Sequence, residues 1–209
     1  MLRAYSGHNE LIEFDKAKAG GFRFFFGVDE AGRGPLAGPV VAAAVLIKDT
    51  GFTCRVGDSK ALSEAQREKA FHEIHDRAVV GVGIMSETVI DDVNILRATH
   101  LAMTAAVKDL ASHLSFEDRE VKVVIDGNSY QGDIPYKVEC VVKGDTKSMA
   151  IACASIVAKV TRDRIMCAYD KVYPQYGFKG HKGYPTEAHR DAIRAHGLSL
   201  IHRKTFRSV

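Results

Sequence analysis

The sequence predicts one layered domain that combines helices with strands, and three observations carry this prediction. The chain has 209 residues, 46% of them hydrophobic, which is enough for one sizeable core and short for two full domains. No internal repeat, low-complexity tract or Pro/Ser-rich linker divides it. Short apolar runs bounded by Gly or Pro alternate with segments whose apolar residues recur at helical spacing. An α/β or α+β layered architecture follows.

Five short apolar runs have the length and the β-branched or aromatic content of buried strands. They cover residues 22–28, 39–47, 79–85, 121–125 and 136–142. The Gly-rich segment 31–38 is expected to join the first two strands as an irregular connection, because it contains Pro35 and is too long for a two-residue turn. Residues 1–21 are expected to be a loosely held lead-in, so that the folded domain spans residues 22–209.

Helical spacing of apolar residues predicts four helices after the second strand. They are expected at residues 63–77, 87–114 with a break near Asn94, 146–169 and 186–196. Ser63 and Gln66 form a capping-box pattern at the first of these helices, and Gly197 ends the last one. A long basic loop is expected over residues 174–183, because Pro174 and three glycines interrupt the helical pattern.

The formal net charge of +3 conceals an asymmetry between two parts of the chain. Residues 1–136 hold 15 Lys and Arg against 20 Asp and Glu, a net charge of −5, whereas residues 137–209 hold 14 against 6, a net charge of +8. A basic C-terminal third is typical of proteins with a polyanionic partner, such as nucleic acid. Because many basic surfaces bind no nucleic acid, charge alone leaves this hypothesis open.

Nothing in the sequence predicts a membrane span or a secretion signal. No stretch approaches the roughly 20 consecutive apolar residues that cross a bilayer, and residues 1–18 mix charged with apolar side chains. We therefore expect a soluble, cytoplasmic protein and, because no heptad pattern stands out, a monomer. The four cysteines, Cys54, Cys140, Cys153 and Cys167, form no C-x-x-C pattern and are expected to be reduced thiols.

Four acidic residues stand at the predicted ends of secondary-structure elements. Asp29 and Glu30 follow the first strand, Asp126 follows the fourth, and Asp145 precedes the long helix. Each has a local alternative, because Asp-Gly-Asn is a common turn, an Asp before a helix is a good N-cap, and adjacent acids can form a solvated strand end. Strands of one sheet can nevertheless bring such ends together.

Carboxylates that converge at one place repel one another unless they are protonated or bind a cation. Oxygen ligands favour Mg²⁺ or Mn²⁺, and no His/Cys pattern at zinc spacing competes with that assignment. Because side chains alternate along a strand, Asp29 and Glu30 are expected to reach one metal only where the strand has already ended. Gly32 and Gly34 fit such an ending.

Six motifs, taken in order, closely resemble those of ribonuclease HII, a type 2 ribonuclease H. They are GVDEAGRGPLAGPV at residues 27–40, DSK at 58–60, IDGN at 125–128, KGD at 143–145, ASIVAKVTRD at 154–163 and HKGYPT at 181–186. The resemblance covers roughly residues 22–207 and is far more specific than a single glycine-rich loop.

The resemblance implies a ribonuclease H-like α/β fold, with a mixed central β-sheet flanked by helices and a C-terminal helical portion beside the substrate groove. It implies that Asp29, Glu30, Asp126 and Asp145 are catalytic carboxylates that hold two divalent ions, Mn²⁺ or Mg²⁺. The implied substrates are RNA/DNA hybrids and duplex DNA that contains single ribonucleotides. Cleavage would leave a 5′-phosphate and a 3′-hydroxyl and would serve the removal of ribonucleotides and RNA primers.

Gly32-Arg33-Gly34 resembles the family's sensor of the 2′-hydroxyl, the group that distinguishes RNA from DNA. Two glycines permit unusual backbone angles and close approach, so that main-chain groups can reach the ribose while Arg33 holds a phosphate. Tyr184 resembles the family's tyrosine that packs on the sugar at the RNA to DNA junction. Taken alone, the glycine loop is compatible with a tight turn and the tyrosine with ordinary surface.

Polar and basic residues along the chain resemble a track for phosphates. The expected phosphate contacts are Asp58, Ser59, Lys60, Lys143 and Lys182, and further candidates on the track are Lys147, Lys159, Arg162, Arg164 and Lys179. Ordinary turn chemistry is the alternative for the motif at residues 58–60. Asp163 lies inside the long helix, where we expect pairing with a nearby Lys or Arg.

Three other hypotheses compete with ribonuclease HII. Ribonuclease HIII shares the carboxylates but carries an extra N-terminal domain and lacks the Gly-Arg-Gly element, whereas about 20 residues precede the first predicted strand here. A nucleic-acid-binding module without catalysis would need only the basic third of the chain. An unrelated metal-dependent phosphotransferase would need neither Gly-Arg-Gly nor Tyr184.

Overall fold

The five apolar runs pair into one mixed sheet in the order β3-β2-β1-β4-β5. The computed structural model describes residues 6–206 and gives the strands as β1 Phe24–Ala31, β2 Val40–Ile47, β3 Ala78–Met85, β4 Val121–Asp126 and β5 Lys137–Val141. The first three strands form an antiparallel meander, and β4 and β5 then extend the sheet parallel to β1. The predicted strands are confirmed to within three residues at each end.

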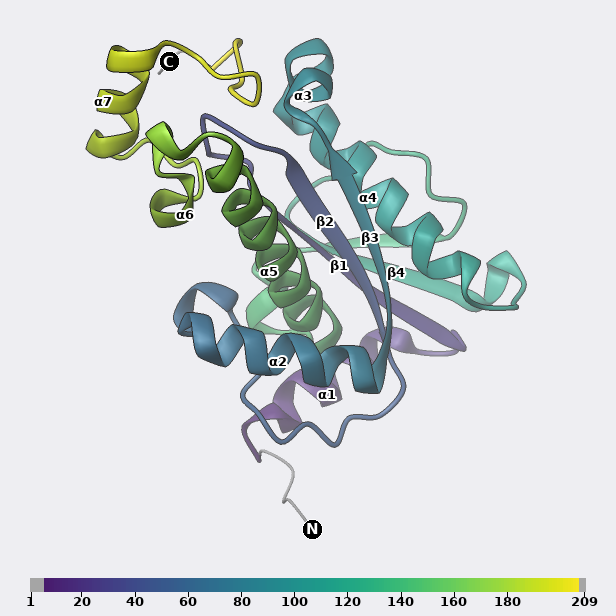
Figure 1. Ribbon diagram of the computed structural model, residues 1–209. Coiled ribbons are helices and arrows are strands. Elements are labelled where there is room, and N and C mark those ends of the chain that lie inside the picture. Colours follow the sequence, from purple (N-terminus) through teal and green to yellow (C-terminus); the bar gives the residue numbers. More distant parts are fainter. Residues whose placement is uncertain (1–5, 207–209) are drawn as a thin grey trace.

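The described part of the chain has seven helices, of which α6 and α7 lie beyond one end of α5 and away from the sheet (Figure 1). They are α1 Asn9–Ala19, α2 Glu64–Arg77, α3 Glu87–Val93, α4 Ile95–Ser112, α5 Met149–Val172, α6 Phe178–His181 and α7 Glu187–His196. Short 3-10 turns precede or follow several of them, at Ser6–His8, Ser59–Ala61, Asp118–Glu120, Gly144–Thr146 and Pro174–Tyr176. No helix among residues 6–206 is long and apolar enough to cross a membrane.

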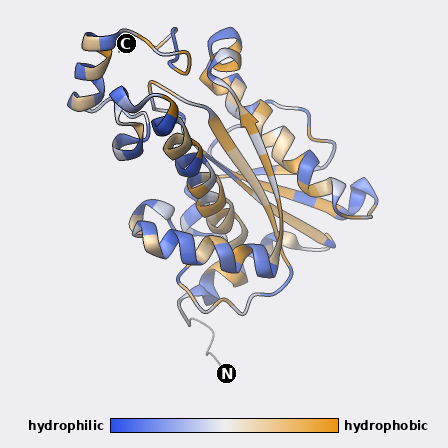
Figure 2. Ribbon diagram, in the orientation of Figure 1, coloured by the Kyte–Doolittle hydropathy of each residue, from blue (hydrophilic) through white to orange (hydrophobic). Residues whose placement is uncertain are grey.

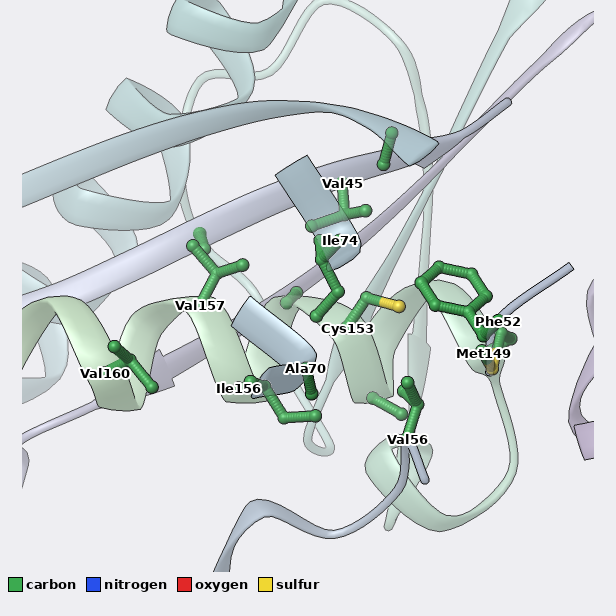
Figure 3. Packing of buried hydrophobic residues seen from close by; sticks show 14 of the residues in the cluster. Val45, Phe52, Val56, Ala70, Ile74, Met149, Cys153, Ile156, Val157 and Val160 are labelled. Atoms are coloured by element: carbon green, nitrogen blue, oxygen red, sulfur yellow. The ribbon is translucent and has the colours of Figure 1, made fainter. Parts of the chain in front are cut away.

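The two faces of the sheet are covered by different helices because alternate side chains of β2 point in opposite directions. Ala43 and Val45 pack in a cluster with α5 and α2, part of which Figure 3 shows from close by. Ala42 and Ala44 pack in a second cluster with α4. Figure 2 shows the apolar residues concentrated on the strands and on the inner sides of the helices, with hydrophilic residues along α2. The result is a three-layer arrangement with cores on both faces.

Helix ends follow the local chemistry in two of the predicted places. The Ser63 and Gln66 capping box at the start of α2 is confirmed, with both reciprocal hydrogen bonds present. The break near Asn94 is also confirmed, because Asn94 adopts φ 68°, ends α3 and caps α4 through its side chain. The long helix begins later than predicted. Ser148 is the N-cap of α5, so Asp145 lies before the helix and is not its cap.

The expectation of a loosely held lead-in at residues 1–21 is wrong for its helical part. α1 packs its apolar Leu11 and Ile12 against the core formed by α5 and α2. Its Asp15 carboxylate accepts a hydrogen bond from the Ala150 N–H at 2.9 Å, which places α1 at the start of α5. Residues 1–5 lie outside the described part. The contact between Asp15 and Ala150 joins residues 135 positions apart in the chain, so no local pattern predicts it.

The basic loop predicted at residues 174–183 is partly helical, because it contains a 3-10 turn and α6. A small third core holds it beside α7 and the chain end, and consists of Ala37, Met166, Tyr176, Phe178 and Ile201. Ala37 also forms an isolated antiparallel bridge with His202. The C-terminal helical portion therefore packs directly on the loop that joins β1 to β2.

We expect Gly27→Ala to destabilise the protein by about 1–3 kcal/mol, because overpacking a close contact forces the backbone apart. A Cβ at Gly27 would overlap the backbone of Ala150 and Ile151, where α5 crosses β1. Gly21→Ala is the matched control, since nothing lies near its Cβ position. Urea unfolding of both variants measures the difference. Equal midpoints for the two variants would contradict this close β1–α5 contact.

Candidate functional site

The acidic residues that follow Val28 lie within β1 and not after it. β1 stays paired with β2 as far as Ala31, so the expectation that the strand ends before Asp29 is wrong. On its other side β1 pairs with β4 only as far as Val28. Asp29 and Glu30 therefore have a neighbouring strand on one side and an open edge on the other. Both side chains nevertheless line the same pocket, although they are consecutive residues of one strand.

Asp29 is held by hydrogen bonds from two directions. Its side chain is almost wholly buried, at 6% exposure. The carboxylate accepts a hydrogen bond from the Glu30 N–H at 2.7 Å and another from the Ser155 hydroxyl of α5. The Ser155 hydroxyl in turn lies 2.9 Å from that of Ser59. Ser59, expected as a phosphate contact, is thus a buried neighbour of Ser155.

A tight turn brings Asp145 to Asp126, the last residue of β4. The Oδ1 of Asp126 accepts a hydrogen bond from the Gly144 N–H at 2.6 Å. A Cβ at Gly144 would lie 3.3 Å from the Asp126 carboxylate and would displace the end of the Ile151 side chain. This hydrogen bond joins the 3-10 turn that carries Asp145 to the end of the sheet.

The four carboxylates act on one another electrostatically. Burial, followed by the charges of Glu30 and Asp126, raises the pKa of Asp29 well above its usual value. Burial also raises the pKa of Glu30, although the guanidinium of Arg33, 3.3 Å away, opposes the shift. The pKa of Asp145 is raised by burial and then by Asp126. Bringing these groups together therefore costs free energy at neutral pH.

One pocket of about 250 Å³ contains all four acids. It is lined by Asp29, Glu30, Ala31, Gly32, Arg33, Gly34, Ser59, Lys60, Asp126, Asp145, Ser155, Lys159 and Tyr184. The oxygen donors suit Mg²⁺ or Mn²⁺. A cation would offset both the burial of the charges and their repulsion, the two effects that raise the pKa values. Among residues 6–206, no three His, Cys, Asp or Glu side chains stand close enough to form a finished metal site.

The predicted sensor residues line the same pocket as the acids. Gly32, Arg33, Gly34 and Tyr184 all contribute to its wall, and the Tyr184 side chain is 41% exposed. Arg33 forms an ion pair with Glu30 but keeps about half of its side chain exposed. Its guanidinium is therefore free to turn toward an incoming phosphate.

The expected phosphate contacts do not all reach the pocket. Lys60 lines it with an exposed side chain. Asp58 instead accepts a hydrogen bond from the Lys60 N–H at 2.8 Å, which is the turn chemistry named as the alternative. Lys143 and Lys182 do not line the pocket, and the Lys182 ammonium donates to the carbonyl of Lys179.

Part of the wider phosphate track is internal or already paired. Arg162 is 1% exposed, so its prediction as a phosphate contact is wrong. Arg164 pairs with Glu68 at 2.5 Å. Lys159 pairs with Asp163 at 2.7 Å, which confirms the expected pairing of that acid. The helical spacing of the sequence shows which residues of α5 are neighbours. It does not show which face of α5 is buried by the small core around Met166 and Phe178.

Two buried arginines are the structural elements of the site that the sequence did not reveal. Arg162 of α5 and Arg203 near the chain end are 1% and 0% exposed, and no described carboxylate contacts either guanidinium. Both donate only to backbone carbonyls in the loops at residues 32–39 and 182. An arginine within a basic run predicts exposure, and no local signal marks it as buried.

Two buried histidines hold the backbone of Tyr184. The Nδ1 of His189 donates to the Tyr184 carbonyl at 3.0 Å, and its Nε2 lies 3.0 Å from the Nε2 of His202. The Nδ1 of His202 accepts from the Ser199 N–H at 2.9 Å. These contacts require two neutral imidazoles, with His202 donating to His189. Burial lowers the pKa of both, that of His202 to about 4, which agrees with neutral rings.

Comparison with known sequences identifies a family over most of the chain. A family model described as Ribonuclease HII matches residues 26–209. The chain is 50% identical to Ribonuclease HII of Acetivibrio thermocellus, over 94% of this chain and 75% of that protein. It is also 50% identical to Ribonuclease HII of Polynucleobacter asymbioticus, over 88% of this chain and 92% of that protein.

Solved structures with the same fold come from related enzymes. Ribonuclease H2 of Pyrococcus horikoshii superposes with a TM-score of 0.68 at 25% identity, covering 88% of this chain and 94% of that one. RNase HII of Archaeoglobus fulgidus, solved in a complex with PCNA, gives 0.70 at 24% identity over 88% and 95%. Bst-RNase HIII, solved with Mn²⁺, gives 0.71 at 17% identity over 92% and 69%. These likenesses confirm the predicted ribonuclease H-like α/β fold.

We expect Asp29→Asn to raise the melting temperature of the metal-free protein by a few degrees at pH 7 to 8. The pKa of Asp29 is raised on folding, so the stability that its proton provides is complete below about pH 3.9 and is lost as pH rises through the folded value. A neutral amide avoids that loss and can still accept the bond from the Glu30 N–H. The gain should shrink toward pH 4.

Calorimetry across this pH range tests the Asp29 prediction, with Asp133→Asn as the matched control because the Asp133 side chain is 97% exposed. Mn²⁺ should stabilise the wild type more than the Asp29→Asn variant, since the variant lacks one anionic ligand. A variant that melts below the wild type at every pH would show that the carboxylates do not repel one another in the folded protein.

Proposed function

Because the chain belongs to the ribonuclease HII family, whose members hydrolyse the RNA strand of RNA/DNA hybrids, we propose that it also incises duplex DNA at single embedded ribonucleotides. The observation that carries the proposal is the convergence of four carboxylates and the Gly-Arg-Gly loop in one pocket. The products would be a 5′-phosphate and a 3′-hydroxyl. The enzyme would act as a cytoplasmic monomer in the removal of ribonucleotides and RNA primers.

Asp29, Glu30, Asp126 and Asp145 are proposed to hold two divalent ions, Mn²⁺ or Mg²⁺. When bound, such ions activate a water molecule and stabilise the departing oxygen of the phosphodiester. The protein prepares two of the four carboxylates in advance. Asp29 is oriented by the Glu30 N–H and the Ser155 hydroxyl, and Asp126 by the N–H before Asp145. Fixed ligands reduce the reorganisation needed when the ions and substrate arrive.

Recognition of the 2′-hydroxyl is assigned to backbone N–H groups. No described residue accepts a hydrogen bond from the N–H of Arg33 or Gly34, and both residues line the pocket. A ribose hydroxyl there would accept from these donors, whereas a deoxyribose would leave them unpaired. Arg33 and Gly34 are exposed in the free protein, so their N–H groups would lose water only when a strand covers them. Leaving a donor unpaired in that covered state costs about 1–3 kcal/mol, which discriminates against DNA. The Tyr184 ring is proposed to pack on the same sugar.

Phosphates of the bound strand are proposed to meet basic side chains at the rim of the pocket. Lys60 and Arg33 are exposed there, and Arg33 exchanges its contact with Glu30 for a phosphate oxygen. Lys143 and Lys182 lie outside the pocket wall and would act on phosphates farther along the strand. These contacts position the duplex but carry no information about the sugar.

The purified protein should cut a DNA duplex that contains one ribonucleotide, only in the presence of Mg²⁺ or Mn²⁺, and should leave an all-DNA duplex intact. Asp126→Asn should reduce the cleavage rate by at least about 1,000-fold, because a metal ligand is lost, while duplex binding stays nearly unchanged. Gel analysis of the end-labelled strand and fluorescence anisotropy give the two quantities. Asp133 is an exposed acid in the loop that follows β4, and the control variant Asp133→Asn should cut at the wild-type rate.

Two results would count against this function. Equal cutting of the all-DNA duplex would exclude a sugar sensor at the Gly-Arg-Gly loop. Full activity of Asp126→Asn would exclude this carboxylate from the catalytic set.

A further inference from the structure

We propose that Arg203 is the positioning residue that sets ribonucleotide selectivity, by fixing the peptide units of Gly32 and Arg33 so that the following N–H groups face the substrate sugar. The proposal rests on the proposed function, because it concerns the same sensor loop. It adds a residue that touches neither substrate nor metal, from a segment about 170 residues away along the chain.

The Arg203 guanidinium donates four hydrogen bonds to backbone carbonyls of the loop that joins β1 to β2. Its Nη2 donates to the Gly32 carbonyl at 2.6 Å, and its Nη1 donates to the Arg33 carbonyl at 3.0 Å. Its Nε and Nη2 both donate to the Gly38 carbonyl, at 2.9 and 2.8 Å. The side chain is 0% exposed. A planar fork of five N–H donors is the only side chain that can bind three carbonyls in this way.

These hydrogen bonds determine where the backbone N–H groups of Arg33 and Gly34 point. In a trans peptide unit, the carbonyl of one residue and the N–H of the next point in opposite directions. The Gly32 and Arg33 carbonyls point at the buried guanidinium, so the N–H groups of Arg33 and Gly34 point away from it. Those two N–H groups have no acceptor among the described residues. Arg203 therefore holds two adjacent donors in place before any substrate is present.

A second arginine extends this arrangement to the segment that carries Tyr184. Arg162 donates to the carbonyls of Pro39 at 2.9 Å, Ala37 at 3.1 Å and Lys182 at 3.0 Å. Its guanidinium also lies 5.9 Å from the centre of the Tyr184 ring. The sensor loop and the tyrosine are thus joined through one buried cation, and a displacement of either segment would disturb the other.

The chain around Arg203 is anchored from outside the site. Asp91 of α3 accepts from the N–H groups of Lys204 at 2.9 Å and Thr205 at 3.0 Å, and from the Thr205 hydroxyl at 2.7 Å. The N–H of Arg203 itself donates to the Leu36 carbonyl at 2.8 Å. Asp91 offers a way to loosen Arg203 without changing a buried residue.

The guanidinium charges also match a polyanionic substrate. Burial lowers the pKa of Arg203 to about 9 and that of Arg162 to about 10, so both stay protonated at neutral pH. No described carboxylate contacts either group. Glu87 and Asp91 attract Arg203, and Asp163 attracts Arg162, without forming an ion pair. Two buried positive charges therefore lie beneath the loop that a phosphodiester would approach, where the low dielectric strengthens their effect.

Arg203→Lys tests the proposal, because it keeps the charge but carries all its donors on one nitrogen. A single ammonium cannot reproduce four bonds that leave three nitrogens of a planar fork. We expect kcat on the single-ribonucleotide duplex to fall on the order of 100-fold, as a small misplacement of a positioned group does, with KM nearly unchanged. The ratio of cutting at ribonucleotide to cutting at deoxyribonucleotide positions should fall with it. Arg119→Lys, at an arginine 83% exposed, is the control and should keep wild-type values.

Hydrogen exchange supplies a readout that does not depend on activity. In Arg203→Lys the amides of Leu36 and Gly38, which donate to Gly183 and Ile201, should exchange faster, while those of β1 keep their protection. Asp91→Ala should show the same pattern with a smaller loss of kcat. It alters a partly exposed side chain, so it provides the test even where the buried substitution unfolds the protein.

The outcomes separate this proposal from the proposed function. Wild-type kcat and selectivity in folded Arg203→Lys or Asp91→Ala, with faster exchange in the loop, would overturn the role of Arg203 and leave the function intact. A wild-type protein that cuts DNA and ribonucleotide sites equally would overturn the function itself. Loss of selectivity in both variants, with β1 protected, would support the proposal.

Discussion

Mutual repulsion among four carboxylates is the constraint on which the rest of this structure depends. The sheet brings them together because β1 continues beyond its last pair with β4, and the turn at Gly144 then adds Asp145 to the end of β4. Burial, and after it the charges of neighbouring acids, raises the pKa of Asp29 and of Asp145, so keeping both groups ionised in the fold costs free energy. The cores on both faces of the sheet must offset that cost.

The two buried arginines, Arg162 and Arg203, support the loops around the pocket but do not line it. Their role is not to neutralise the acids. Neither Arg162 nor Arg203 contacts an acid among the described residues, although acids lie in the adjoining pocket. Burying a guanidinium is costly unless its donors are satisfied, and here backbone carbonyls satisfy them. The same bonds hold loops that have no regular secondary structure. Two buried guanidiniums therefore hold segments of irregular backbone in place.

Features fixed by neighbouring residues could be predicted from the sequence. The strands were found from local alternation and composition, although β1 runs to Ala31, beyond its predicted end. The Ser63 capping box and the break at Asn94 depend on contacts within a few residues, and both were predicted correctly. The acids were identified from their places near strand ends and from family motifs. The packing of α1 and the burial of Arg203 depend on partners about 135 or more residues away. No local periodicity contains that information.

The charge asymmetry of the sequence shows that a count of charged residues does not reveal which of them are exposed and unpaired. A net charge of +8 in residues 137–209 suggested a long surface for phosphates. In the fold, two of those arginines are internal and two further cations, Lys159 and Arg164, are paired with acids. Less positive charge is thus available to the backbone of a nucleic acid than the count implies. Selectivity for RNA must then come from geometry, because phosphates are common to both nucleic acids and only the 2′-hydroxyl differs.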